Sequence, residues 1–246
     1  MSKQVWQFEP TDRWIRAIRS GETIADSRRA RLMIESRGEL DYYFPIDDVR
    51  MEWLTPSDHT ETSGYRGLRK FWHLNLADEH IENAAWTYEP QEKRPDFTGY
   101  IALAWKAMDH WYEEEEEIFH HPRNPYHRVD TLPSSRHVEV FIDGIKVADT
   151  TRPYLLFETN LPTRYYIPPE DVEQAYLTPT SSHTTCPYKG VASYYSVSVN
   201  GETLTDVVWT YPNPIPEAPK IKGLLAFWPE KDKRIRMFVD GQSVRN

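Results

Sequence analysis

The sequence predicts a mainly β protein of the α+β class, with two homologous, compact, antiparallel β-rich domains in tandem and one helix between them. Three observations lead to this fold class. The 246-residue chain matches itself at a constant spacing of 123 residues. Both copies contain short runs of β-branched and aromatic residues between Gly, Pro and Asp, which is typical of strands. Two dipeptides, Asp143-Gly144 and Asn200-Gly201, accept the positive φ that a two-residue hairpin turn requires.

The internal repeat runs without a gap from Gly21 to Tyr88. Loops change length more readily than cores do, so a constant spacing predicts that even the connecting turns are alike in the two copies. The matched segments include Ile24-Ala25-Asp26-Ser27 with Val147-Ala148-Asp149-Thr150, Tyr42-Tyr43-Phe44-Pro45 with Tyr165-Tyr166-Ile167-Pro168, and Trp86-Thr87-Tyr88 with Trp209-Thr210-Tyr211.

The first copy is predicted to span residues 12–118 and to end in a helix. Apolar residues recur at helical spacings from Ala102 to Ile118. The run Glu113–Glu117 is typical of a solvated helix end. Residues 119–136 contain turn formers and no periodicity, which predicts a linker. Its histidines, His120, His121 and His127, are of a type that binds metals, but in a proline-broken loop they are interpreted as unstructured polar residues.

The second copy is predicted to span residues 137–246 and to be mostly antiparallel sheet. Its end, Met237–Gly241, echoes Val140–Gly144, which predicts a last strand that either closes the second sheet or bridges the copies. The other predicted strands are Val138–Ile142, Lys146–Asp149, Leu155–Glu158, Arg164–Ile167, Tyr194–Val199, Leu204–Thr210 and Leu224–Phe227.

Composition narrows the function classes. A formal net charge of −9 would repel a phosphate backbone, so we expect no nucleic-acid partner. No run of about eighteen apolar residues is present, so we expect no membrane partner. The N-terminus has no signal-peptide or transit-peptide pattern and the chain has one cysteine, which predicts a cytoplasmic protein without a disulfide. Whether it forms a homo-oligomer is left open.

Four motifs in the second copy resemble a known family. In order they are VADTTRPYLLFET, PTRYYIPPEDV, LTPTSSHTTCPYKGVASYYSV and VVWTYPNPIPEAPKIKGLLAFW. They are similar to the bacterial and fungal domain-of-unknown-function family 427, which is also filed under a nucleotidyltransferase-like label. The resemblance covers about 138–228 closely and about 14–105 more loosely. It implies a tandem version of a compact β-rich domain and no particular activity.

The two copies differ most in chemistry at one motif. His183, Cys186, Pro187 and Lys189 stand where the first copy has Thr60, Ser63, Gly64 and Arg66, whereas Tyr65/Tyr188 and Gly67/Gly190 are kept and are interpreted as structural. A thiol attacks as its thiolate, and a nearby His or Lys favours that form. The motif therefore indicates Cys186 as nucleophile or proton donor and His183 as base, with Lys189 or Arg152 as the group that holds an anionic substituent. The alternative is an inert core cysteine.

Acidic, basic and aromatic residues supply the other candidates. Glu158 and Arg152 recur as Glu35 and Arg29, which fits either a structural salt bridge or a pocket lining. Arg164 has Asp41 as its counterpart. The complete candidate set is Cys186, His183, Lys189 and Glu158 as catalytic residues, and Arg152, Tyr166, Tyr188, Tyr195 and Arg164 as substrate-binding residues.

No metal or cofactor is expected. A structural zinc site needs paired Cys or Cys/His spacings, which one cysteine does not provide, and a three-ligand site of His183, Cys186 and Glu158 follows no spacing rule. The sequence favours a small-molecule-binding protein, acting as an enzyme on a small polar or aromatic metabolite if the Cys/His pocket is catalytic. The alternatives are a noncatalytic protein-interaction scaffold and, third, nucleotidyl transfer, for which the sequence has no glycine-rich phosphate loop.

Overall fold

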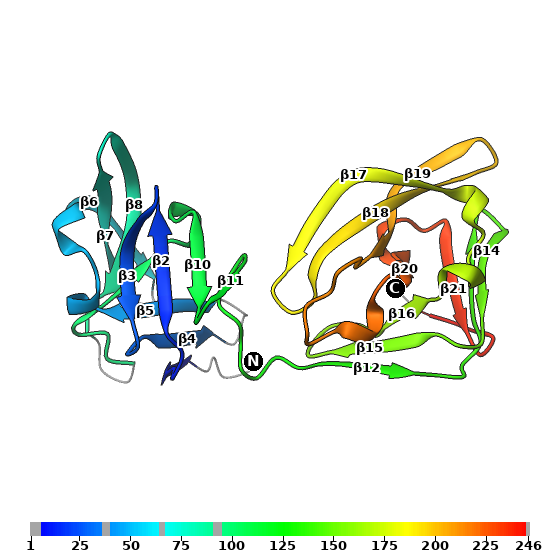
Figure 1. Ribbon diagram of the computed structural model, residues 1–246, viewed down its shortest axis with the longest axis horizontal. Coiled ribbons are helices and arrows are strands. Elements are labelled where there is room, and N and C mark those ends of the chain that lie inside the picture. The colour runs from blue at the N-terminus through cyan, green and yellow to red at the C-terminus, as the bar shows by residue number, and fades with distance from the viewer. Residues whose placement is uncertain (1–5, 36–39, 64–66, 91–94, 245–246) are drawn as a thin grey trace. The chain divides into compact units, whose positions relative to one another are not determined.

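The computed structural model describes residues 6–35, 40–63, 67–90 and 95–244. It divides into two units, Met1–Asn124 (unit 1) and Pro125–Asn246 (unit 2), shown in Figure 1. Each unit has one seven-stranded and one four-stranded sheet, and every pair of neighbouring strands in them is antiparallel. The prediction of a mainly β, tandem fold is confirmed.

Unit 1 contains strands β1 to β11. Its seven-stranded sheet has the order β1 (Trp6–Pro10), β4 (Arg31–Glu35), β5 (Leu40–Pro45), β9 (Tyr100–Leu103), β8 (Glu79–Tyr88), β7 (Gly67–Leu76) and β6 (Leu54–Ser63). Its four-stranded sheet has the order β11 (Glu116–Ile118), β10 (His110–Glu113), β2 (Ile15–Arg19) and β3 (Glu22–Ser27). Three short 3-10 helices connect them: η1 (Ile46–Asp48), η2 (Met51–Trp53) and η3 (Trp105–Ala107).

Unit 2 repeats this topology. Its seven-stranded sheet has the order β12 (Val129–Pro133), β15 (Tyr154–Glu158), β16 (Arg164–Ile167), β20 (Leu225–Phe227), β19 (Glu202–Thr210), β18 (Gly190–Val199) and β17 (Leu177–Cys186). The four-stranded sheet has the order β14 (Ile145–Thr150), β13 (Val138–Ile142), β21 (Ile235–Val239) and β22 (Gln242–Ser243). The 3-10 helices are η4 (Pro169–Asp171), η5 (Gln174–Tyr176), η6 (Pro219–Ile221) and η7 (Pro229–Lys231). In Figure 1 the long strands β17 to β19 arch over this unit.

Two apolar layers form in each unit, one on either face of the seven-stranded sheet. In unit 2 the larger layer joins Val138, Val140 and Ile142 of β13 to residues of the seven-stranded sheet such as Ile167 and Val208, so it lies between the sheets. The smaller layer lies on the other face, called here the outer face. It contains Leu156, Tyr166, Ala192, Tyr211, Ala218, Ile221 and Ala226. The candidate site described below lies on this outer face.

The predicted helix from Ala102 to Ile118 is wrong. The segment ends β9, makes the single 3-10 turn η3 and then forms the β10–β11 hairpin, in which Trp111 pairs with Ala17 of β2. The helical spacing of its aromatic residues is a coincidence. Side chains alternate with a period of two residues in each strand, and the turn between the strands shifts the pattern. The described residues contain no helix between the units.

The glutamate run is largely exposed, as expected of a solvated segment, but it forms a hairpin and several of its side chains are paired with cations. Glu114 has a positive φ of 53° and turns the chain between β10 and β11. Three arginines then meet the acidic side chains: Arg13 pairs with Glu113, Arg16 with Glu115, and Arg123 with Glu116. The Tyr42 hydroxyl also donates a hydrogen bond to Glu113 at 2.6 Å. Cross-strand pairing and these ion pairs explain why a run of glutamates forms a hairpin here.

The structure decides two expectations about the ends of unit 2: the linker before it and the last strand within it. Strand β12 lies within the predicted linker, 119–136, and pairs with β15 along its length. At the other end, β21 pairs with β13 inside the same unit, so the last long strand closes the second sheet, the first of the two predicted alternatives. No helix among the described residues has the length and apolar character needed to cross a membrane.

Candidate functional site

A pocket of about 190 Å³ opens on the outer face of unit 2. Alternate residues of a strand point to the same face, so side chains two residues apart gather there. The pocket is lined by Leu156 and Glu158 of β15, Arg164 and Tyr166 of β16, Trp209 and Tyr211 at the end of β19, and by Leu161, Lys189, Tyr194 and Trp228.

A small residue separates two of the large walls. Ala226 of β20 pairs with Tyr166 on one side and with Trp209 on the other. Across it, the Trp209 indole Nε1 donates a hydrogen bond to the Tyr166 hydroxyl at 3.1 Å. Alanine at this position keeps the space between the two rings clear, and the hydrogen bond fixes their orientation.

A buried ion pair forms the charged side of the pocket. Lys189 Nζ donates to Glu158 Oε2 at 2.5 Å, with side chains only 11% and 5% exposed. His127 Nε2 lies 3.0 Å from the other carboxylate oxygen, and the His127 ring stacks on Tyr188 with centroids 4.1 Å apart. Buried charges are stable only when paired, so this group is held in one arrangement.

The turn between β17 and β18 places Lys189 over the sheet. Gly190 begins β18 with a φ of +98°, a conformation that glycine adopts without strain. The Lys189 amide donates to the carbonyl of Cys186, and the Lys189 carbonyl accepts from Ile215 at 3.1 Å. These backbone bonds tie the lysine to the segment that follows β19.

The Tyr211 hydroxyl is a polar group of the pocket that has no hydrogen-bond partner among the described residues. Tyr211 is 5% exposed, and no described residue makes a hydrogen bond to its hydroxyl. Burial raises the pKa of Tyr211 above its usual value of 10, and the nearby Tyr166 and Cys186 raise it further. The group therefore stays a neutral hydroxyl that can both donate and accept a hydrogen bond.

Aromatic and charged residues surround the pocket's other side. Arg164 Nη1 contacts both carboxylate oxygens of Glu230, at 2.7 and 2.8 Å, and its guanidinium lies 5.6 Å from the centre of the Trp209 ring. Trp228 packs edge-on against Trp209, with ring centroids 6.2 Å apart. Both cations of the pocket, Arg164 and Lys189, are thus already paired with a carboxylate.

Unit 1 has the same hydrogen-bonded Trp–Tyr pair, but an arginine side chain lies where unit 2 has its pocket. Trp86 Nε1 donates to the Tyr43 hydroxyl at 3.2 Å across Ala102, matching the Trp209–Tyr166 pair. The counterpart of Ala192 is Arg69, which donates from Nε and Nη2 to the Tyr88 hydroxyl at 2.9 and 2.5 Å. Tyr88 is the counterpart of Tyr211, so the hydroxyl that is unpaired in unit 2 is bonded in unit 1.

Four of the candidate residues from the sequence meet in the pocket: Lys189, Glu158, Tyr166 and Arg164. Three others lie elsewhere. Arg152 is 63% exposed and pairs with Asp171, as Arg29 pairs with Asp48 in unit 1, so this recurring arginine makes a structural ion pair. Tyr195 packs against the core between the sheets, and Tyr188 stacks on His127.

The structure separates the proposed cysteine–histidine pair. Both residues lie on β17, and an i, i+3 pair on an extended strand points to opposite faces. His183 is exposed and lies 3.3 Å from the Ser193 hydroxyl, whereas Cys186 packs half-buried against the outer-face cluster. Neither residue lines the pocket. Their catalytic roles remain predictions.

Of the aromatic walls, the sequence singled out Tyr166 and missed the others. Trp209 and Tyr211 fit a core strand equally well, and Tyr194 and Trp228 have no motif around them. The replacement of Arg69 by Ala192 was a usable signal, because loss of a large side chain beside kept aromatic residues indicates space. His127 was also missed, since β12 follows it where a linker was predicted. Tyr65 and Arg66, the counterparts of Tyr188 and Lys189, lie outside the described residues.

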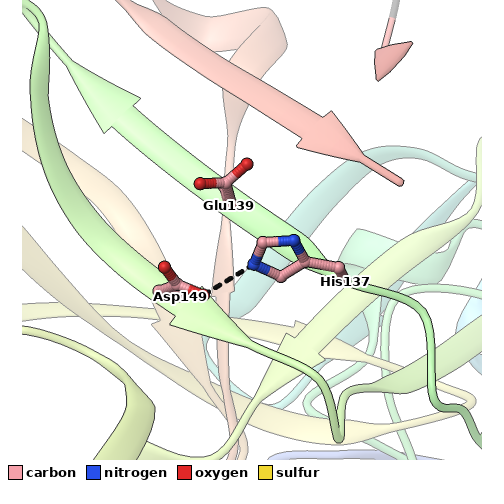
Figure 2. A group of neighbouring side chains, drawn as sticks. All are labelled: His137, Glu139 and Asp149. Atoms are coloured by element: carbon pink, nitrogen blue, oxygen red, sulfur yellow. Dashed lines mark hydrogen bonds and ion pairs between the residues drawn. The ribbon is translucent and has the colours of Figure 1, made fainter. Parts of the chain in front are cut away.

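A second cluster of ligand-type side chains is structural. Figure 2 shows His137, Glu139 and Asp149 on the four-stranded sheet of unit 2. Lys146 Nζ bonds to both carboxylates, at 2.6 and 2.7 Å, and so offsets part of their charge. His137 Nε2 lies 2.7 Å from Asp149, and in unit 1 the Trp14 indole makes the same contact with Asp26 at 2.6 Å. The contact between a ring nitrogen and this aspartate therefore recurs in both units.

Comparison with known proteins agrees with the repeat seen in the fold. A family model described as a domain of unknown function (DUF427), which carries a nucleotidyltransferase label, matches residues 7–114 and again residues 130–241. No curated protein matches the chain. The two matches cover most of the sequence, and each falls within one structural unit. The chain therefore belongs to the DUF427 family, as a tandem member with two copies of the domain.

Proposed function

We propose that unit 2 binds a small, planar metabolite in the outer-face pocket. The observation that carries this proposal is the Tyr211 hydroxyl, which ends a largely buried side chain, faces an open pocket and has no hydrogen-bond partner among the described residues. A hydroxyl that faces a pocket without a protein partner is free to donate a hydrogen bond and to accept one. A ligand, or the water that a ligand displaces, supplies that partner.

The lining defines the shape and chemistry of the ligand. Aromatic side chains from three positions, Tyr194, Trp209 and Tyr211, offer flat apolar surfaces, and Glu158 with Lys189 provides one charged side. Apolar walls with a few convergent polar groups are typical of small-molecule sites. The volume of about 190 Å³ lies below the usual range for drug-sized ligands, so a single ring with one polar substituent fits best.

The test is ligand binding followed at the pocket's own tryptophan. The Trp209 indole N–H, assigned by Trp209→Phe, is observed by heteronuclear NMR while single-ring acids, alcohols, amides and amidines are titrated into the full-length protein. We expect at least one class to shift this resonance at millimolar concentration or below. If no compound of the set shifts it, the pocket is not a binding site for this kind of molecule.

Ala192→Arg is the matched negative control. Unit 1 carries arginine at the equivalent position and keeps the same scaffold, so the substitution is expected to fill the pocket without unfolding the unit. Any ligand that binds wild-type protein should lose at least about tenfold in affinity. Unchanged affinity in a folded Ala192→Arg variant would place the ligand elsewhere and contradict the proposal.

The same variants separate the alternatives. An enzyme that uses Cys186 would bind the ligand but lose turnover in Cys186→Ser, because Cys186 does not line the pocket. A protein-interaction scaffold would keep its partner in Ala192→Arg. Nucleotidyl transfer requires a nucleotide site, so a thermal shift with nucleotides and magnesium that survives Ala192→Arg would favour it over the pocket proposal.

A further inference from the structure

The first unit contains an occupant for the equivalent pocket within its own chain. The Arg69 side chain is 19% exposed, and its guanidinium carbon lies over three rings, 5.0 Å from Trp86, 5.1 Å from Tyr88 and 5.5 Å from Phe71. Two of its nitrogens donate to the Tyr88 hydroxyl. This is a planar cation held by an aromatic cage and by a hydroxyl acceptor, with the Glu61 carboxylate 3.4 Å from Nη1.

Unit 2 keeps the cage and lacks the occupant. The counterparts of the three rings are Tyr194, Trp209 and Tyr211, and all three line the pocket. The counterpart of the arginine is Ala192, a residue whose side chain ends at Cβ. The rings and the acceptor hydroxyl are thus present on the outer face of unit 2, and the planar cation that they enclose in unit 1 is missing.

We infer that the ligand of the unit 2 pocket carries a planar amidinium or guanidinium group, which lies against Trp209 and donates a hydrogen bond to the Tyr211 hydroxyl. This inference rests on the proposed function of the same pocket. It names the chemical class of the ligand, which the pocket's volume and aromatic walls alone leave open.

The charges of the pocket are compatible with a cation. Lys189 is neutralised by Glu158 and Arg164 by Glu230, so the lining carries no uncompensated positive charge. In unit 1 the carboxylate of Glu61 lies 3.4 Å from Arg69, and Thr184 replaces it in unit 2. In unit 2 the carboxylate that lines the pocket, Glu158, is already paired with Lys189, so the aromatic rings and the Tyr211 hydroxyl would hold the cation.

Three compounds of nearly the same shape test the ligand class. Benzamidinium, benzamide and benzoate differ in charge at one planar substituent, and each is titrated into full-length protein while the Trp209 indole resonance is followed. We expect benzamidinium to bind at least about tenfold more tightly than either of the others, because a cation gains from a desolvated aromatic cage. Ala192→Arg should abolish this binding.

Arg69→Ala provides an independent positive control in unit 1. It removes the built-in guanidinium and leaves the cage, so benzamidinium or methylguanidinium should shift the Trp86 indole resonance only in this variant. The number of benzamidinium sites should rise from one in the wild type to two in Arg69→Ala. Arg69→Lys, which keeps a cation but not a planar one, should leave unit 1 folded and still closed to methylguanidinium.

The outcomes distinguish this inference from the proposed function. If benzoate or benzamide binds the wild-type pocket as tightly as benzamidinium, the cationic class is wrong while a small-molecule site remains. The cationic class is also wrong if a ring compound without an amidinium or guanidinium group binds the pocket and benzamidinium does not. If benzamidinium enters unit 1 of Arg69→Ala but not unit 2 of the wild type, the likeness between the cages does not extend to ligand choice, and the inference is overturned.

Discussion

Glu158 accepts contacts from two residues that are distant from it in the sequence. Lys189 reaches one carboxylate oxygen from the β17–β18 turn, and His127 reaches the other from the start of unit 2. The carboxylate and the ammonium group are both largely buried, so each depends on the other for compensation. This pair fixes one side of the pocket and also contributes to the stability of unit 2.

Glu158→Gln should destabilise unit 2 because it leaves the buried Lys189 without its counter-charge. Removal of one partner of a buried pair costs about 3 kcal/mol of unfolding free energy. The double substitution Glu158→Met with Lys189→Met should recover most of that loss, since neither charge remains. Urea unfolding followed by tryptophan fluorescence measures both variants.

The control for this prediction is an exposed ion pair. Asp149→Asn weakens the contact with Lys146, whose side chain is 42% exposed, and should cost less than about 1 kcal/mol. Equal losses for Glu158→Gln and Asp149→Asn would show that burial of the Lys189–Glu158 pair has no special weight.

Among the elements, the β17–β18 turn is the one that brings a charged group to the pocket. Its sequence, Cys186 to Gly190, contains the cysteine and the lysine of the candidate set and a glycine that the repeat indicates as structural. The turn directs Lys189 over the outer face, while the extended strand before it separates His183 from Cys186. Of the predicted catalytic residues Cys186, His183 and Lys189, this turn therefore places only Lys189 in the pocket.

Gly190→Ala should destabilise this turn more than Gly201→Ala destabilises the β18–β19 turn. Both glycines have positive φ, at 98° and 81°, so alanine is strained at either position by about 1 kcal/mol. At Gly190 a Cβ would also lie 3.3 Å from the Asn213 carbonyl, whereas at Gly201 nothing lies within 4 Å. Thermal unfolding of the two variants compares the costs, and equal losses would show that the close contact relaxes freely.

The sequence predicted elements best where a turn residue marks them. Asp143-Gly144 and Asn200-Gly201 do connect neighbouring strands, because their positive φ is a local property. The β10–β11 hairpin was missed because glutamates, rather than Gly or Asn, form its turn and distant arginines stabilise it. The sequence predicted the charged residues of the pocket, because they belong to recognisable motifs. It did not predict Trp209 and Trp228, which become pocket walls only when strands far apart in the sequence are paired.

At the scale of the whole molecule, each unit contains its own sheets, core and ion pairs. The Arg29–Asp48 pair in unit 1 and the Arg152–Asp171 pair in unit 2 occupy equivalent positions. All residues that line the pocket lie within unit 2. Stability and binding can therefore be assigned to one unit at a time.

Acid should destabilise both units over a similar range of pH. The Arg152 hydrogen bond lowers the pKa of Asp171; for Asp48, burial alone would raise the pKa, but Arg29 and Ser27 lower it overall. A folded-state pKa below the unfolded value stabilises the fold above about pH 4, and this stability is lost as the pH falls through the lowered pKa. Unfolding free energies between pH 6 and pH 2 test this, and Asp48→Asn or Asp171→Asn should flatten the acid dependence.

The fragment 125–246 should fold alone and keep the pocket. Its two sheets and their core belong entirely to unit 2, so no strand loses a neighbour when unit 1 is removed. The indole resonance of Trp209 in the fragment should match that in the full chain. A fragment without dispersed amide signals would show that the unit depends on the rest of the chain.

The filled cage of unit 1 gives every experiment on this protein an internal reference. Trp86 and Trp209 hold equivalent places and make the same hydrogen bond to a tyrosine, but one has an arginine over it and the other faces an open pocket. A change in temperature, salt or pH acts on both indoles in one sample. A shift of the Trp209 resonance alone therefore reports occupancy of the pocket. A shift of both indole resonances reports a change in the solution conditions.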